Sequence, residues 1–238
     1  MHQLSTLSGA ILEPMLRADP VGPRITYYDD ATGERIELSG VTLANWAAKT
    51  GNLLRDELGA GPGSRVAILL PAHWQTAAVL FGVWWIGAEA VLAGPADLAL
   101  CTAQRLDEAD DAVSGGEVAV LSLDPFGRPA PDLPIGVTDY ATAVRVHGDQ
   151  IVPEPSPGPA LGGRSVDEVL ADCQSSAAAR GLTSGDRVLS GASWSGPAEL
   201  VDGLLAIMAV GGSLVQVANA DPAGQERRIE TEKVTRVL

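Results

Sequence analysis

Apolar and polar residues recur along the chain with the periods of helices and strands. A helix over residues 5–19 is predicted by apolar residues that share one of its sides: Leu7, Ile11, Leu12, Met15 and Leu16. Two β-rich runs, RITYYDD and ERIELSG, flank the short turn ATG. Such runs around a glycine-containing turn predict a β-hairpin.

A helix-strand-helix-strand order follows the hairpin. Thr42 is placed to cap a helix that runs to about residue 58, where the glycines of GAGPG end it. The next run, SRVAILL, is apolar enough to be a strand buried on both faces, as parallel strands are. A helix over residues 73–86 and the strand AEAVLA complete the order, with Gly87 between them.

The same order returns about half-way along the chain. Ser165 caps a predicted helix, GLTSGD turns the chain, and RVLSGAS forms a strand. A helix over residues 197–210 and the strand SLVQVAN follow. Three pairs of residues match between the copies at a constant separation of 122 positions: Gly63 and Gly185, Arg65 and Arg187, and Val66 and Val188.

Each copy contains a βαβ unit, which requires parallel strands and a right-handed connection. The sequence therefore predicts an α/β fold of layered, doubly wound, mostly parallel sheets with two related βαβ-containing halves. The first half spans residues 1–147 and the second spans 165–238, with a proline- and glycine-rich linker over 148–164. Two alternatives stay open: a chance match between similar turns, and a surface loop in place of the linker.

The remaining segments carry weaker patterns. DLALCTAQRLDEADDA predicts a helix, EVAVLSLDP predicts a strand, and residues 126–134 predict a loop. The tail, DPAGQERRIETEKVTRVL, predicts a charged helix that runs into the start of a strand, with no partner strand after it.

Composition and charge narrow the classes of function. With 238 residues, 46% hydrophobic and 19% charged, the chain has the composition of a globular protein. A formal net charge of −14 disfavours nucleic acid and anionic membranes as partners, and its dispersed carboxylates indicate solubility. The apolar stretch 77–94 contains Gly87 and Glu89, and so predicts a buried helix and strand in preference to a membrane span.

Cysteine and histidine are too few and too scattered for a metal or disulfide framework. Cys101 and Cys173 lie outside any CxxC motif, and His2, His73 and His147 lack the spacing of metal ligands. The N-terminal residues show no signal peptide. These features favour a reduced, cytoplasmic protein without a metal cofactor.

The order of elements resembles the N-terminal part of adenylate-forming enzymes, the superfamily of acyl-CoA synthetases, adenylation domains and luciferases. The resemblance rests on residues 22–95 and 165–238, and above all on GPGSRVAILLP and GLTSGDRVLSGASWSGPAELVDG. Ser64 stands where the family usually has Asp, and Ile86-Gly87-Ala88 stands for its Lys-Ala-Gly-Ala turn. Since all the basic residues except Lys49 and Lys233 are arginine, the chain resembles a short member from a GC-rich actinobacterium.

The resemblance implies a phosphate loop near residues 150–165, and there the sequence departs from the family. A Ser/Thr/Gly run with a lysine is expected, but the chain reads PEPSPGPALGGRS. Prolines lack the backbone N–H that such a loop turns toward phosphate. The family's later adenine-site motifs and its lid with a catalytic lysine also have no counterpart. ATP and Mg²⁺ are therefore not expected as cofactors, and no residue is assigned a catalytic role.

Other short motifs fit turns better than chemistry. GAGPG precedes a strand and misses the dinucleotide pattern. GASWSG is one residue away from a nucleophile elbow, but no histidine follows residue 147 to complete a triad. GGRS brings Arg164 near a helix start and can hold an anion, although Asp167 and Glu168 already suit that helix end and favour simple capping.

Ligands of open α/β sheets bind beyond the carboxyl ends of the strands. The residues predicted to line such a cleft are His73, Ser193, Trp194 and Ser195. The first hypothesis is thus a degenerate acyl-CoA-synthetase-like domain, inactive alone, that binds an acyl, CoA-like or nucleotide-like ligand. The second is an interaction module that forms a homodimer or binds a protein partner through a sheet edge. The third is a small hydrolase with Ser193 as nucleophile.

Overall fold

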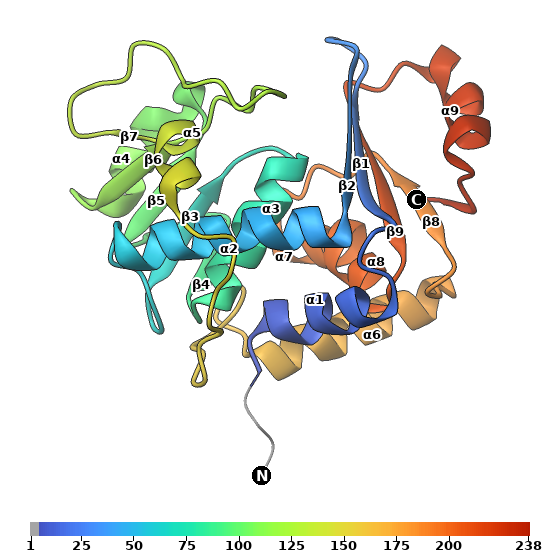
Figure 1. The fold of residues 1–238 in the computed structure, drawn as a ribbon, viewed down its shortest axis with the longest axis horizontal. Coiled ribbons are helices and arrows are strands. Elements are labelled where there is room, and N and C mark those ends of the chain that lie inside the picture. The colour runs from blue at the N-terminus through green and yellow to red at the C-terminus, as the bar shows by residue number, and fades with distance from the viewer. Residues whose placement is uncertain (1–4) are drawn as a thin grey trace. The chain divides into compact units, whose positions relative to one another are not determined.

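A computed structural model describes residues 5–238 (Figure 1). The chain divides into two compact units that interleave along the sequence. The first unit comprises residues 5–9, Ala44–Leu70 and Ala78–Val166. The second unit comprises Ala10–Leu43, Pro71–Ala77 and Asp167–Leu238.

Each unit contains a five-stranded, mostly parallel sheet, which confirms the predicted α/β class. In the first unit the strand order is β4-β3-β5-β6-β7, and all neighbouring strands are parallel. Its strands are β3 (Arg65–Leu69), β4 (Glu89–Val91), β5 (Leu98–Cys101), β6 (Glu117–Val120) and β7 (Thr138–Asp139).

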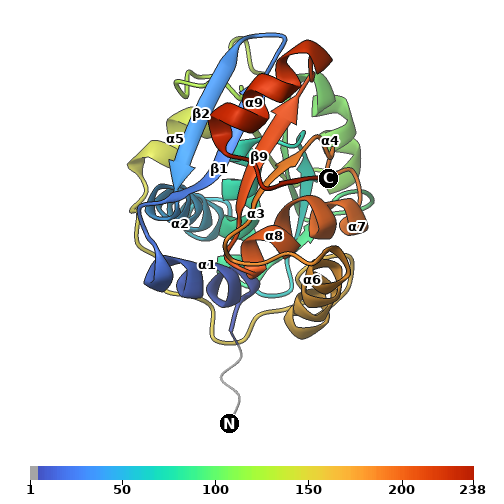
Figure 2. The same cartoon turned by 90° about the vertical axis from the view of Figure 1, so that its right-hand side faces the viewer.

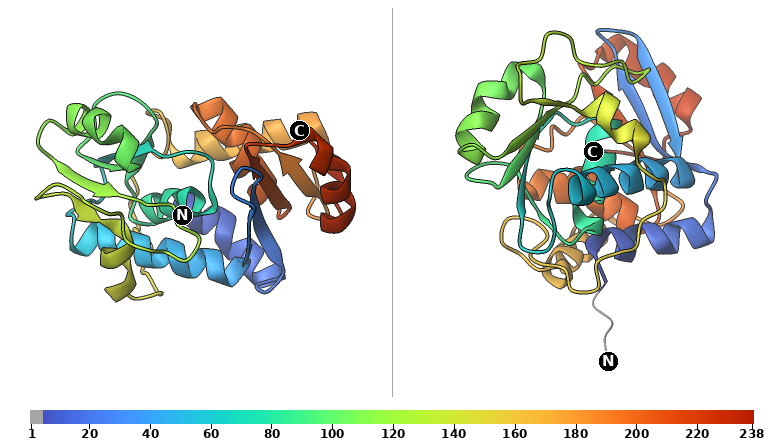
Figure 3. Two further views of the ribbon diagram at one scale, coloured as in Figure 1. Left: turned by 90° about the horizontal axis from the view of Figure 1, so that it is seen from above. Right: turned by 60° about the vertical axis from the view of Figure 1, so that its left-hand side comes forward.

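Helices flank both faces of the first sheet (Figure 3). On one face α4 (Leu106–Val113) packs Ala109 and Val113 against apolar side chains of β3, β5 and β6. On the other face lies α2 (Gly40–Asp56), where Thr50 is hydrogen-bonded at 2.7 Å to Tyr140 of α5 (Tyr140–Ala143). Short 3₁₀ turns at Ala103–Arg105 and Val144–Val146 complete the connections.

The first predicted βαβ unit is confirmed. β3 leads through α3 (Trp74–Trp85) to β4, which pairs parallel to β3 with Arg65 opposite Glu89. Between them Gly87 adopts a left-handed φ of +74°, which a residue with a Cβ rarely takes. Two local predictions are wrong. DLALC forms β5 and only the residues after it are helical, and Ser39, not Thr42, caps α2 by accepting the Thr42 N–H at 3.2 Å.

The second unit holds the sheet β10-β8-β9-β1-β2 (Figure 2). Only β1 and β2 are antiparallel, as the predicted hairpin requires, and the other neighbours are parallel. The strands are β1 (Pro23–Asp29), β2 (Glu34–Ser39), β8 (Arg187–Ser190), β9 (Ser213–Ala218) and β10 (Arg236–Val237). The tail strand predicted to lack a partner is β10, and it pairs with β8.

The helices of the second unit include the second predicted βαβ connection. It runs from β8 through α7 (Pro197–Leu200), a π-helical turn (Val201–Leu205) and α8 (Ala206–Ala209) to β9. Helix α9 (Gln225–Glu232) lies across the strands in Figure 2 and packs Ile229 against Leu189, Val215 and Val217. The remaining elements are α1 (Leu7–Ala18), α6 (Val166–Arg180) and a 3₁₀ turn (Pro222–Gly224).

The sheets do not follow the linear order of the chain. The hairpin was expected with the first half, but β1 pairs with β9, so the hairpin belongs to the second sheet. A pairing across this sequence distance leaves no local pattern. Whether residues 1–147 and 165–238 act as separate domains joined by 148–164 stays a prediction.

Among the described residues, no helix is both long and apolar enough to cross a membrane. The apolar stretch 77–94 becomes most of α3 followed by β4.

Candidate functional site

The loop that follows β8, residues 191–196, lies at the carboxyl end of a parallel strand. It contains three of the four residues predicted to line a cleft. Ser193 and Ser195 are exposed, and their hydroxyls donate to one oxygen of Glu199 at 2.7 and 2.9 Å. The Ser195 N–H donates to the same oxygen at 3.0 Å. These bonds hold the pKa of Glu199 below its usual value, and the bond from Ser193 has the largest effect.

Trp194 is buried between these two exposed serines. Its φ of +57° is a left-handed conformation that is rare for a bulky residue. The indole packs against Gly203 in the π-helical turn, where a methyl group added to the glycine would lie 3.1 Å from the indole nitrogen. The indole N–H is buried and has no acceptor among the described residues. Strained residues and π-helical turns are both enriched at functional sites.

Gln216 of β9 faces the same loop. Its amide nitrogen donates to the carbonyl of Ala192 at 3.0 Å. Since that carbonyl can only accept, the amide oxygen must point elsewhere, and within residues 5–238 it has no donor. Two buried polar groups, the Trp194 N–H and the Gln216 oxygen, therefore lack partners at one end of the second sheet.

His73, the fourth predicted residue, is buried before α3 and does not act on the serines. Its ring meets the ring of Tyr27 edge-on at 4.3 Å. Nδ1 accepts the Gln75 N–H at 3.1 Å, so the neutral ring carries its proton on Nε2, 3.8 Å from a Glu34 oxygen. Burial lowers the pKa of His73 to about 3. The contacts described for His73 are with these residues and Trp74, not with the loop 191–196.

In the proline-rich segment 153–164 of the first unit, most backbone N–H groups are either absent or hydrogen-bonded to the chain itself. Residues 153, 155, 157 and 159 are prolines. The N–H groups of Glu154 and Gly158 donate to Trp85 and Gly87 at 3.0 Å each, and that of Ser156 donates to the Glu154 carboxylate at 3.0 Å. The N–H groups of Ala160, Leu161 and Arg164 bond within the turn 160–164. Every residue from 153 to 164 except Gly162 is thus a proline or a donor to the chain itself.

Glu89 supplies the last of these acceptors. It lies on β4, is 7% exposed, and accepts the Gly163 N–H at 2.6 Å. Arg65 approaches its other oxygen at 3.5 Å. On the same strand the Ala90 N–H donates at 2.9 Å to the Ala160 carbonyl, which also accepts the Trp84 indole N–H at 2.7 Å. A carboxylate therefore accepts a backbone N–H of the segment where the resemblance implies a phosphate loop.

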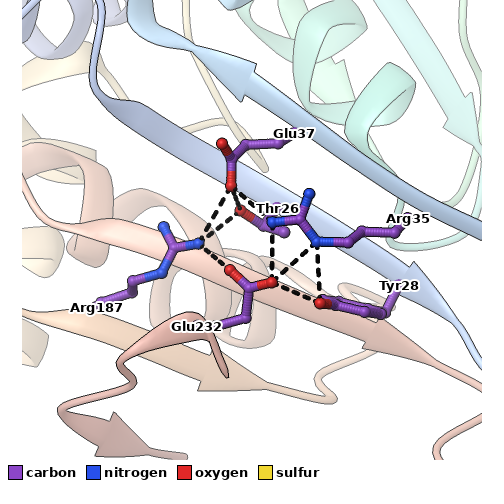
Figure 4. A network of polar contacts seen from close by, with 6 residues as sticks. All are labelled: Thr26, Tyr28, Arg35, Glu37, Arg187 and Glu232. Carbon is purple, nitrogen blue, oxygen red and sulfur yellow. Dashed lines mark hydrogen bonds and ion pairs between the residues drawn. The ribbon is translucent and has the colours of Figure 1, made fainter. Parts of the chain in front are cut away.

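A polar network joins α9 to the second sheet (Figure 4). Glu232, with a side chain 3% exposed, accepts from Arg187 at 2.5 Å, from the Tyr28 hydroxyl at 2.5 Å and from Arg35 at 2.9 Å. Arg187 also donates to Thr26 at 2.9 Å. Glu37 pairs with Arg35 at 3.0 Å and lies 3.5 Å from Arg187.

Sequence reasoning missed this network, except that Arg187 marked the repeat. Tyr28 and Glu232, which are hydrogen-bonded, are 204 positions apart in the sequence, so no local motif links the members. The alternation of Thr26 with Tyr28, and of Arg35 with Glu37, places each pair on one face of its strand and is the one signal that the sequence offers. The network fixes α9 on the sheet and has the character of a structural element.

Among residues 5–238, no group of three His, Cys, Asp or Glu side chains is arranged to hold a metal ion. His2 lies outside the described residues. Cys101 and Cys173 are buried free thiols.

No model of a known protein family matches the chain. A protein of Mycobacterium tuberculosis (strain ATCC 25618 / H37Rv), described as a TIGR03089 family protein, is 80% identical over 239 residues, with 98% of each chain covered. It is an actinobacterial relative of nearly equal length.

Two solved ligases share the fold. An acyl-CoA synthetase of Brucella canis matches 98% of this chain with a TM-score of 0.81 at 19% identity. The anthranilate CoA ligase AuaEII, solved with anthranoyl-AMP, matches 100% of this chain with a TM-score of 0.74 at 17% identity. The chain spans about half the length of these ligases, 46% and 50% respectively. At such identities the likeness establishes the fold alone.

Proposed function

The chain belongs to the TIGR03089 family, and from that premise we propose that it is a ligand-binding domain of the acyl-CoA synthetase fold that does not adenylate acyl groups by itself. Its ligand is a small acyl or nucleotide-like molecule. The ligand binds in the second unit, at the carboxyl ends of β8 and β9, where the loop 191–196 lies.

The proposal rests mainly on residues 153–164, which offer few free backbone N–H groups to a phosphate. A loop that binds ATP phosphates presents several free backbone N–H groups, usually with a cation beside them. In this segment prolines remove some donors, internal hydrogen bonds use others, and Glu89 binds the Gly163 N–H. A triphosphate would have to displace a carboxylate of its own sign. The residues present therefore do not fit Mg-ATP.

The ligand site is supported by the second unit. Ligands of parallel sheets bind beyond the carboxyl ends of the strands. There the chain places the strained Trp194, the unsatisfied amide oxygen of Gln216, and two exposed serines on Glu199. The buried ring of His73 packs edge-on against Tyr27 of the same sheet, and we assign His73 a packing role.

The contacts do not favour the hydrolase hypothesis. The Ser193 hydroxyl donates to a carboxylate, and both ring nitrogens of His73 face other groups. A homodimer or a protein partner stays a prediction that sedimentation would test.

The test of the proposed function is acyl-dependent exchange of pyrophosphate into ATP, with an active acyl-CoA synthetase as positive control. We expect no exchange above background for acetate, medium-chain fatty acids, benzoate or anthranilate. A Glu89→Gln variant, which removes the internal carboxylate, is the matched comparison. Exchange by the wild-type chain with any of these acids would overturn the proposal.

A further inference from the structure

A long loop of the first unit holds its shape with its own hydrogen bonds. Residues 121–137 connect β6 to β7 without forming a helix or a strand (Figure 1). Loops longer than about 12–15 residues in compact domains are usually either functional or disordered. Here the Asp124 carboxylate accepts the N–H groups of Phe126 and Arg128 at 2.8 and 3.2 Å. The Ser122 hydroxyl donates to the Arg128 carbonyl at 2.6 Å, so the tip of the loop is a built turn.

Phe126 stands at the tip of this turn and faces solvent. Its side chain is 77% exposed. The Arg128 guanidinium lies over the ring, 5.8 Å from the ring centre, which is within the range of a cation–π contact. An aromatic ring left in water forgoes the free energy that its burial would supply. Because the turn already holds the backbone of Phe126, a partner that buries the ring loses little conformational entropy in ordering the loop.

Two exposed arginines flank the ring. Arg128 lies against it, and the guanidinium of Arg145 donates to the carbonyl of Gly127, the residue after Phe126. Val146, which follows Arg145, is also exposed. Among residues 5–238 neither guanidinium forms an ion pair with a carboxylate. The exposed ring is therefore bordered by two positive charges that have no internal counter-charge.

This arrangement is unusual in a chain with a formal net charge of −14. Other exposed arginines, such as Arg17 and Arg105, pair with a carboxylate of their own helix or turn. Around the loop the carboxylates serve the backbone instead. Asp124 accepts two N–H groups of the turn, and the two oxygens of Asp139 each accept a backbone N–H at 2.8 Å. Carboxylates that match both arginines must come from another molecule.

We propose that Phe126, Arg128, Arg145 and Val146 form a docking surface, the Phe126 surface, for a protein partner that presents a short acidic segment with an aromatic side chain. Carboxylates fit the guanidinium fork, and an aromatic side chain packs on the exposed ring. Arginine and aromatic residues are also the types enriched at the centres of interfaces. A short segment suits the charge of the chain, since a long polyanion or an anionic membrane is repelled by it.

The Phe126 surface lies in the first unit, whereas the proposed function places a small ligand in the second. The two proposals therefore stand on different residues. Pyrophosphate exchange with an acyl group would overturn the proposed function and leave the Phe126 surface standing.

The test is fluorescence polarisation of a labelled random copolymer of glutamate and tyrosine, titrated with the full chain. Polyglutamate of the same length is the probe without aromatic groups. We expect the copolymer to bind more tightly than polyglutamate, and added salt to weaken both by screening the arginines. Phe126→Ser should weaken binding of the copolymer about tenfold, a loss typical of a truncated aromatic anchor. Arg128→Gln should weaken binding of both polymers.

Val21→Ser is the matched control, because Val21 has the same exposed fraction, 77%, and lies in the second unit. Arg17→Gln is the control for the loss of one exposed charge. Both should bind as the wild type does. Equal binding of the two polymers, or equal affinities of Phe126→Ser and Val21→Ser, would overturn the proposal. If Phe126→Ser unfolds, Arg128→Gln decides, since the backbone bonds of the turn remain, and an affinity equal to that of Arg17→Gln would overturn it.

The same variants identify other occupants of the surface. Binding to phosphatidylglycerol vesicles that requires Phe126, without binding to the copolymer, would overturn the acidic partner. A dimer in sedimentation that Phe126→Ser dissociates and Val21→Ser preserves would assign the surface to a second copy of the chain and would overturn it as well.

Discussion

Glu232 is the most consequential carboxylate in the second unit, and Glu232→Gln measures its contribution. One of its oxygens accepts from Tyr28 and Arg35, and the other accepts from Arg187 at 2.5 Å. In the variant, when the amide oxygen keeps the first two bonds, the amide NH₂ must face the donors of Arg187. The Arg187 side chain, 12% exposed, then retains Thr26 and a carboxylate 3.5 Å away.

The magnitude follows from the burial of the pair. Removing one partner of a buried ion pair costs about 3–5 kcal/mol. For a chain of this size each kcal/mol lowers the melting temperature by about 2–4 °C, so a loss of roughly 6–20 °C is expected. Arg105 and Glu108 provide the control, because they lie as close, at 2.7 Å, but are 40% and 53% exposed. Glu108→Gln should cost below about 1 kcal/mol.

The assay is thermal unfolding followed by circular dichroism, with hydrogen exchange of α9 as the local readout. Burial raises the pKa of Glu232, but the bonds from Tyr28, Arg187 and Arg35 lower it overall. Its stabilisation is therefore present above the usual pKa of 4.5 and is lost as pH falls through the lower folded value. Wild type and variant should converge in acid. Equal melting temperatures for Glu232→Gln and Glu108→Gln at pH 7 would refute the reasoning.

Three further outcomes are expected. Glu89→Ala deprives the Gly163 N–H of its acceptor, so hydrogen exchange at residues 161–164 should accelerate at least tenfold. Unchanged exchange would contradict a role of Glu89 in holding this segment. Because burial lowers the pKa of His73 to about 3, wild type should lose about 1.4 kcal/mol of stability per pH unit between pH 6 and 4 relative to His73→Asn; parallel urea midpoints across that range would exclude it. Burial raises the pKa of both Cys101 and Cys173 to about 11, so a thiol reagent at pH 8 should label both only after unfolding, and rapid labelling of the native chain would disprove their burial.

The elements with a local signature could be predicted from the sequence. The β-rich runs RITYYDD and ERIELSG around a glycine-containing turn predicted the hairpin, and the turns before Arg65 and Arg187 predicted both βαβ units. Apolar runs fixed the strands because parallel strands are buried on both faces. The helix predicted at DLALC failed because a short apolar run fits a strand as well as a buried helix.

Features set by distant contacts could not be predicted. Nothing near Thr26 reveals that β1 lies beside β9, and nothing near Glu232 reveals Arg35 or Tyr28. For the candidate site, the sequence located the loop with Ser193, Trp194 and Ser195, but not the left-handed Trp194. Its conformation depends on Gly203, which leaves room for the indole. The absence of a lysine near residues 150–165 was visible in the sequence, whereas the bond from the Gly163 N–H to Glu89 was not.

We propose that this domain, which has the fold of an acyl-CoA synthetase, binds its ligand without ATP. The most direct measurement is the melting temperature of the purified chain with a non-hydrolysable acyl-adenylate mimic, with CoA, with AMP and with Mg-ATP. A ligand at 100 times its dissociation constant stabilises by about 2.7 kcal/mol, which corresponds to a shift of roughly 5–11 °C. We expect such a shift with at least one of the first three compounds and none with Mg-ATP. A shift with Mg-ATP, or none with any of them, would contradict it.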